Sequence, residues 1–211
     1  MIDGATRVLI LTNDDGLDAP GLAALGVAAR RFGRCLVVAP LDPQSSCSHA
    51  VTTRRALRIE RRDDGRIGID GTPADCVRLA LHHFEPATDW VLAGINAGGN
   101  LGSDIHLSGT VAAVREAALH GVRGIAFSHY LARGREPDWE RAAGWAGRVL
   151  GELLERTGEP GTFWNVTAVT LPSRQSARTR TSPAPVSSVN ARRRCACHAP
   201  RSRPRQSRGS C

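Results

Sequence analysis

The chain of 211 residues contains no lysine and few aromatic residues, and none of its 20 acidic residues lies in the last 39 positions. We attribute the missing lysine to compositional bias. No apolar run approaches the roughly 20 residues that a membrane-spanning helix needs, and no charged-then-apolar signal segment opens the chain. The six cysteines are too scattered to predict a disulfide framework. These absences argue against a membrane or secreted protein, and we expect the protein in the cytoplasm.

The charge divides the chain at Pro172. Residues 1–172 hold 18 arginines and all 20 acidic residues, a net charge of −2, whereas residues 173–211 hold 10 arginines and no acid. This tail, residues 173–211, is rich in Arg, Ser and Pro and has almost no large apolar side chains to offset the entropy of ordering it. We predict one domain over residues 1–172 and a disordered tail.

The most informative segment is an apolar strand that runs into two carboxylates. Residues 8–11 are continuously apolar, which is typical of a strand buried on both faces of a parallel sheet. Asp14 and Asp15 come directly after it, at the end of the strand where ligands bind in such sheets. Neighbouring carboxylates repel each other, and a hard divalent cation is the usual compensation. A plain turn is the alternative, since Asn-Asp-Asp-Gly also favours turns.

Strands alternate with helices along residues 1–172, which predicts an α/β fold. We expect a three-layer, Rossmann-like architecture: a mostly parallel sheet flanked by helices, with a small β-hairpin excursion around Asp64-Gly65. The pattern predicts strands over 8–11, 35–39, 57–61, 67–69 and 90–93, and helices over 20–32, 72–84 and 111–119.

Three loops should meet at one edge of this sheet. They are the acidic pair (Asp14 and Asp15), a hydroxyl-rich loop over residues 41–50, and a glycine-rich loop over 94–104 that leads into Ser108-Gly109-Thr110. The last tripeptide opens a helix, whose amino end offers free N–H groups to an anion, although Ser108 is also a plain helix cap. Together these groups suit metal-assisted attack on a phosphate ester.

Five motifs carry a resemblance to a known family: LTNDDG at 11–16, VAP at 38–40, GTPADCV at 71–77, GINAG at 94–98 and SGTV at 108–111. Over roughly residues 6–167 the chain closely resembles the SurE family of stationary-phase survival proteins. The resemblance implies a divalent-metal-dependent nucleotidase or phosphatase acting on nucleoside monophosphates, with one Mg²⁺ or Mn²⁺ ion. The lack of a long apolar run predicts no membrane partner.

The same resemblance implies the site residues. The metal ligands fall on Asp14, Asp15, Ser45 and Asn96, and the two aspartates are also the catalytic residues. The groups around the phosphate fall on Asn13, Asn100, Ser108, Gly109 and Thr110. Water and an aspartate both stay open as the nucleophile.

The chain departs from the family at two places. Ser46 stands where a glycine usually follows the serine ligand, and the family's carboxyl-terminal region is replaced after Val166. The switch to an acid-free composition indicates a frameshift or an unrelated extension. Because relatives are homodimers or tetramers built through that region, the oligomeric state stays open.

Two alternative functions follow. One is a catalytically impaired remnant of the family. The other is a non-specific nucleic-acid binder acting through the tail, which is less favoured because the tail has no interleaved aromatic residues.

Overall fold

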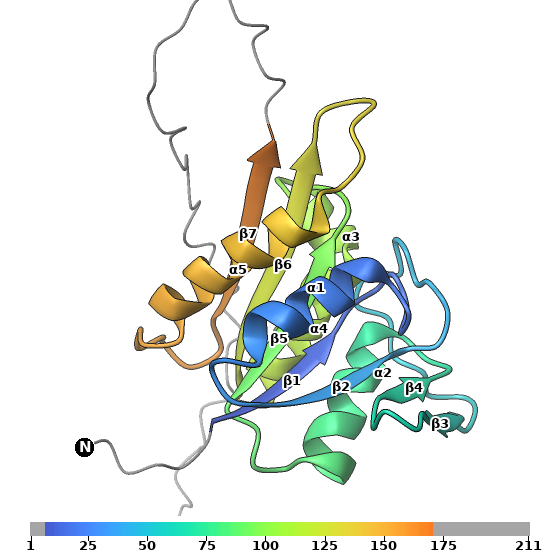
Figure 1. The fold of residues 1–211 in the computed structure, drawn as a ribbon. Coiled ribbons are helices and arrows are strands. Elements are labelled where there is room, and N and C mark those ends of the chain that lie inside the picture. The colour runs from blue at the N-terminus through green and yellow to red at the C-terminus, as the bar shows by residue number, and fades with distance from the viewer. Residues whose placement is uncertain (1–6, 171–211) are drawn as a thin grey trace, which may run out of the picture.

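The structure is a computed structural model that describes residues 7–170, so the predicted tail and its boundary at residue 172 lie outside the described residues. One seven-stranded sheet has the order β3-β4-β2-β1-β5-β6-β7 (Figure 1). The strands are β1 (Val8–Thr12), β2 (Arg34–Pro40), β3 (Ile59–Arg61), β4 (Ile67–Ile69), β5 (Trp90–Asn96), β6 (Arg123–Leu131) and β7 (Phe163–Thr170). The helices are α1 (Pro20–Ala29), α2 (Pro73–Leu79), a π-helical turn η1 (Ala80–Phe84), α3 (Asp104–Leu107), α4 (Gly109–Leu119) and α5 (Trp139–Leu153).

The sheet is parallel except for the hairpin, in which β3 runs antiparallel to β4. Helices α1 and α5 lie side by side on one face, and α2 and α4 cover the other (Figure 1). The predicted three-layer α/β fold with its hairpin excursion is therefore confirmed.

The first strand is buried on both faces, as its unbroken apolar run predicts. Leu9 and Leu11 belong to the core beneath α1 and α5, whereas Ile10 belongs to the core beneath α2 and α4. All three side chains are completely buried, because alternate residues of a strand point to opposite faces. β1 is thus fixed in the middle of the sheet, and the turn after Thr12 is held at the sheet's carboxyl edge.

Two predicted helices differ in extent from the prediction. The first ends at Ala29 rather than Phe32, because residues 30–32 turn toward Gly33, whose Cα lies against the Arg7 backbone. A Cβ on Gly33 would lie 2.2 Å from the Arg7 carbonyl oxygen. The helix predicted over 72–84 begins as expected at the Thr72 cap, but its last five residues widen into η1.

The topology predicts a ligand-binding crevice beside β1, at a switch point of the sheet. The chain passes from β1 to β2 on one side and reaches β5 on the other side only later, so the strand order reverses between β1 and β5. Ligands bind at such switch points, outside the carboxyl ends of the strands. No helix within residues 7–170 has the length and apolar character that a membrane crossing requires.

Candidate active site

The acidic pair lies in the turn after β1. The Asn13 side-chain amide donates to the Gly16 carbonyl, at 2.8 Å, and closes the turn around the two aspartates. Gly16 has a φ of 102°, a conformation that favours glycine. Asp14 is 6% exposed and Asp15 is half-buried, so both carboxylates stand between the protein interior and the crevice.

The amino end of α4 meets Asp14. The Thr110 hydroxyl donates to Asp14 Oδ1 at 2.5 Å, and the backbone N–H groups of Gly109 and Thr110 also donate to this carboxylate. A Cβ on Gly109 would lie 2.8 Å from Asp14 Cβ, so the approach depends on glycine. The structure thus brings together three predicted site residues, Asp14, Gly109 and Thr110. Asp14 and Thr110 are 96 positions apart in the sequence.

Burial makes the acidic pair costly to ionise. It raises the pKa of Asp14, although the hydrogen bonds from Thr110 and Gly109 oppose the shift. Burial, followed by the negative charge of Asp14, raises the pKa of Asp15 to about 6 despite a hydrogen bond from the Ala97 backbone N–H. Two carboxylates that titrate above their ordinary range gain most from a cation between them.

The two predicted asparagines lie at the end of β5 and in the loop that follows it. Asn96 ends β5, and its side-chain amide donates to the Gly98 carbonyl at 2.8 Å, which leaves the side-chain oxygen for a ligand. Asn100 is 6% exposed; its backbone N–H donates to Ser128 Oγ, and its carbonyl accepts from Asn165 Nδ2. The Asn100 side-chain nitrogen is buried without a hydrogen-bond partner. Its role at the phosphate is what the resemblance implies, and it stays a prediction.

The segment after β2, which we call the Ser45 loop (residues 41–50), borders the acidic pair on the other side. The Gln44 backbone N–H donates to the Asp14 carbonyl oxygen at 2.7 Å. Ser45 itself is exposed, whereas the neighbouring Gln44 contacts Asp14 through its backbone N–H. Ser46 has a φ of 59°, so the chain adopts a glycine-like conformation where the family usually has glycine.

Ser108 is the cap of α4. Its Oγ accepts from the Val111 backbone N–H at 3.1 Å, which satisfies one of the free donors of the first turn. The plain-cap interpretation of Ser108 thus describes this structure. The N–H groups of Gly109 and Thr110, in the same turn, donate to the Asp14 carboxylate.

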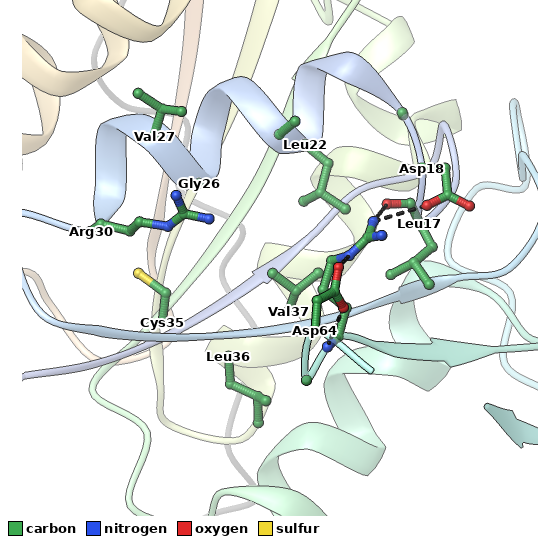
Figure 2. Close-up of a pocket in the computed structure, with 14 residues that line it drawn as sticks. Leu17, Asp18, Leu22, Gly26, Val27, Arg30, Cys35, Leu36, Val37 and Asp64 are labelled. Atoms are coloured by element: carbon green, nitrogen blue, oxygen red, sulfur yellow. Dashed lines mark hydrogen bonds and ion pairs between the residues drawn. The ribbon is translucent and has the colours of Figure 1, made fainter. Parts of the chain in front are cut away.

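A separate groove of about 680 Å³ runs along the outer side of α1, between that helix, β2 and the hairpin turn. Figure 2 shows Arg30 and Cys35 toward one end of this groove and Asp18 and Asp64 toward the other. Arg66 closes the latter end, because it pairs with both Asp18 and Asp64. None of the predicted site residues lines the groove, so it is distinct from the crevice at the carboxyl edge.

The donor set of the crevice fits a hard divalent cation. In residues 7–170 no three His, Cys, Asp or Glu side chains form a metal-binding group. The predicted set contains only two carboxylates and is completed by the oxygens of Ser45 and Asn96, which is the all-oxygen chemistry that Mg²⁺ and Mn²⁺ prefer. The Asn13 side-chain oxygen, buried without a hydrogen-bond partner, is a further acceptor beside the pair.

Three groups at or behind the site carry no signal in the sequence. The backbone N–H of Ala97 and the Sγ of Cys47 lie beside the pair, and His49 binds Glu116 farther along α4. A backbone group has no side-chain signature, and the two ends of the His49 contact are 67 residues apart. Only the fold could have revealed them.

Comparison with known proteins identifies the family of this chain. A family model described as "Survival protein SurE" matches residues 9–190. The chain belongs to the SurE family. The family match includes β1, the acidic pair, the Ser45 loop and the start of α4.

The SurE relatives share much of the sequence. A Nostoc protein named "Putative 5'-nucleotidase alr3139" is 53% identical over 82% of this chain and 74% of its own length. "5'-nucleotidase SurE" of Geobacter sulfurreducens is 42% identical over 79% of this chain and 64% of its own. The crystal structure of the SurE protein from Aquifex aeolicus superposes with a TM-score of 0.71 at 38% identity, over 78% of this chain and 67% of that one. The chain thus spans only part of its relatives' length.

Proposed function

We propose that this SurE homologue is a divalent-metal-dependent 5'-nucleotidase that hydrolyses nucleoside monophosphates to nucleoside and phosphate. One observation carries the proposal. Two adjacent carboxylates with raised pKa values, Asp14 buried and Asp15 half-buried, lie at the switch point of the sheet, and Asp14 contacts the amino end of α4. The relatives named as 5'-nucleotidases support the choice of substrate.

The proposed metal ligands are Asp14, Asp15, Ser45 and Asn96. A Mg²⁺ or Mn²⁺ ion held there would supply positive charge to a phosphate oxygen and lower the pKa of an attacking water. The resemblance to SurE and the all-oxygen donor set support this assignment.

The chain's own groups would orient the phosphate. The side-chain nitrogen of Asn100, buried without a hydrogen-bond partner, is a donor that suits an oxygen of a phosphate ester, whereas the backbone N–H groups of Gly109 and Thr110 hold the Asp14 carboxylate. The Thr110 hydroxyl holds Asp14 in one orientation through its hydrogen bond. Ser108 fixes the first turn of α4, on which both contacts depend.

Phosphate release from a panel of nucleoside 5'- and 3'-monophosphates tests the proposal. We expect turnover with Mn²⁺ or Mg²⁺ that is lost on chelation and in Asp14→Asn, because that exchange removes a ligand charge. Asp18→Asn is the matched control: it removes an exposed carboxylate of the same segment, one that pairs with Arg66 instead. Turnover that survives chelation or Asp14→Asn would contradict the proposal. A folded protein without turnover would favour the impaired remnant.

A further inference from the structure

The Ser45 loop is tied down on both sides of Ser45. At one end the Gln44 N–H donates to the backbone of Asp14. At the other end the Ser48 N–H donates to the Leu107 carbonyl oxygen at 3.0 Å, and the Ser48 hydroxyl donates to the His106 carbonyl oxygen at 2.8 Å. The loop therefore rests on the residues that lead into α4.

A third tie joins the loop to a buried carboxylate. His49 Nε2 lies 2.7 Å from Glu116 Oε2, and Glu116 is 5% exposed. The other carboxylate oxygen of Glu116 lies 2.9 Å from His120 Nε2 and 3.2 Å from Arg78 Nε. One buried charge thus connects the Ser45 loop, α2 and α4.

Glu116 stays ionised in this arrangement. Burial by itself would raise its pKa, but the hydrogen bonds from His49 and His120, with the charge of Arg78, outweigh it and hold the pKa below the ordinary value. Glu116 lies seven residues after Gly109, roughly 10 Å along the helix axis, so it sits behind the crevice rather than in it.

We propose that His49, held by Glu116, is a positioning residue for the metal-binding loop. The inference rests on the proposed function, because it gives the loop the task of presenting Ser45 to the acidic pair. The contact anchors the loop at its far end, as Gln44 anchors it at Asp14. Outer groups that orient metal ligands typically change metal affinity by about 10-fold to 100-fold.

Variants of the different partners of Glu116 can distinguish a positioning role of His49 from a general role in stabilising the fold. Only His49 comes from the loop, whereas Arg78 and His120 come from α2 and the end of α4. Loss of His49 leaves the carboxylate paired with Arg78 and His120, so the packing of the helices should persist while the loop loosens. His120→Ala is the matched control, since it removes an imidazole from the same carboxylate and leaves the loop attached.

The test measures Mn²⁺ binding by the loss of the free-ion signal in electron paramagnetic resonance, on the full chain. We expect about tenfold weaker binding in His49→Ala, near-wild-type binding in His120→Ala, and recovery in His49→Gln, whose amide can still donate to Glu116. Equal weakening in the two alanine variants, or none in His49→Ala, would overturn the proposal.

Amide hydrogen exchange in metal-free protein separates this proposal from the proposed function. Exchange over residues 44–50 should accelerate in His49→Ala and stay unchanged in His120→Ala, whether or not the protein turns over nucleotides. Unchanged exchange in His49→Ala would overturn the positioning role. Mn²⁺ binding that Asp14→Asn leaves intact would instead contradict the metal site itself.

Discussion

Gly109 determines how closely α4 approaches the acidic pair. An added Cβ would lie 2.8 Å from Asp14 Cβ and 2.9 Å from Cys47 Sγ, so Asp14 or the helix must shift. Small displacements of catalytic groups slow a reaction strongly. We therefore expect Gly109→Ala to lower kcat/KM at least about tenfold with the fold intact. Steady-state phosphate release measures this effect.

Gly144→Ala is the control for Gly109→Ala. Gly144 is exposed in the middle of α5, and nothing lies within 4 Å of its added Cβ. This exchange should leave turnover unchanged and stabilise the protein by about 0.5–1 kcal/mol, as alanine usually does in a helix. If the two variants turned over equally, the close approach at Gly109 would be irrelevant to the reaction.

The raised pKa of Asp15 makes a pH prediction for the metal-free protein. Its carboxyl titrates at about 6 when folded against an ordinary value of 3.8, so the folded state holds the proton more tightly. Lowering the pH from about 7 to about 5 should therefore raise the free energy of unfolding, and this gain is lost as the pH rises through 6. The urea midpoint, measured with chelator at both pH values, reports the change.

Asp15→Asn should flatten this pH dependence and raise the midpoint at pH 7, because it removes the buried charge. Part of the slope should remain, since burial shifts the pKa of Asp14 in the same direction. Asp18→Asn, which alters an exposed carboxylate, should keep the wild-type slope. A wild-type slope in Asp15→Asn would show that this carboxyl is not the source.

Side-chain chemistry at the end of a strand was predictable, but contacts between distant segments were not. The apolar run before Asp14 and Asp15 predicted their place at the sheet edge, and the structure shows it. The metal role of Ser45 stays a prediction. The His49–Glu116 contact had no local signal, because its existence depends on how the loop folds over α4.

At the scale of elements, periodicity and capping predicted most of the first 120 residues. Thr72 and Asp75 form the predicted capping box, and Ser108 opens α4 as expected. The sequence analysis predicts no element over residues 122–162, where the structure has β6 and the amphipathic helix α5. β7 (Phe163–Thr170) contains Val166, after which the chain departs from the family.

The capping box of α2 also anchors the segment after the Ser45 loop. Asp75 is buried and accepts hydrogen bonds from Thr52 N, Thr52 Oγ1 and Thr72 N at 2.7–3.0 Å. An amide cannot accept all three bonds as well, so Asp75→Asn should cost about 2–3 kcal/mol in the free energy of unfolding. Urea unfolding measures the loss; Asp63→Asn, in the exposed hairpin turn, should cost almost nothing. Similar losses in both variants would contradict a special role for Asp75.

At the scale of the whole molecule, charge is divided between the two parts of the sequence. Residues 1–172 carry a net charge of −2, and the proposed substrate is itself an anion. The acidic pair would repel a phosphate unless a cation lay between them, which is why metal dependence and substrate class belong to one proposal. The ten arginines of the tail lie at the other end of the sequence and beyond the described residues.

Those arginines make a separate prediction about nucleic acid. Any binding of single-stranded RNA by the full chain should be blind to sequence and fall steeply with salt, with a slope of log K against log salt no steeper than roughly −7 for ten phosphate contacts. Replacing Arg192, Arg193 and Arg194 by serine should make that slope shallower by about 2. Filter-binding titrations over a salt series measure both slopes, and phosphate release from the same samples should not change. If the triple exchange left the slope unaltered, the RNA contacts would lie outside these three arginines. If it also lowered nucleotidase turnover, the tail would contribute to the active site.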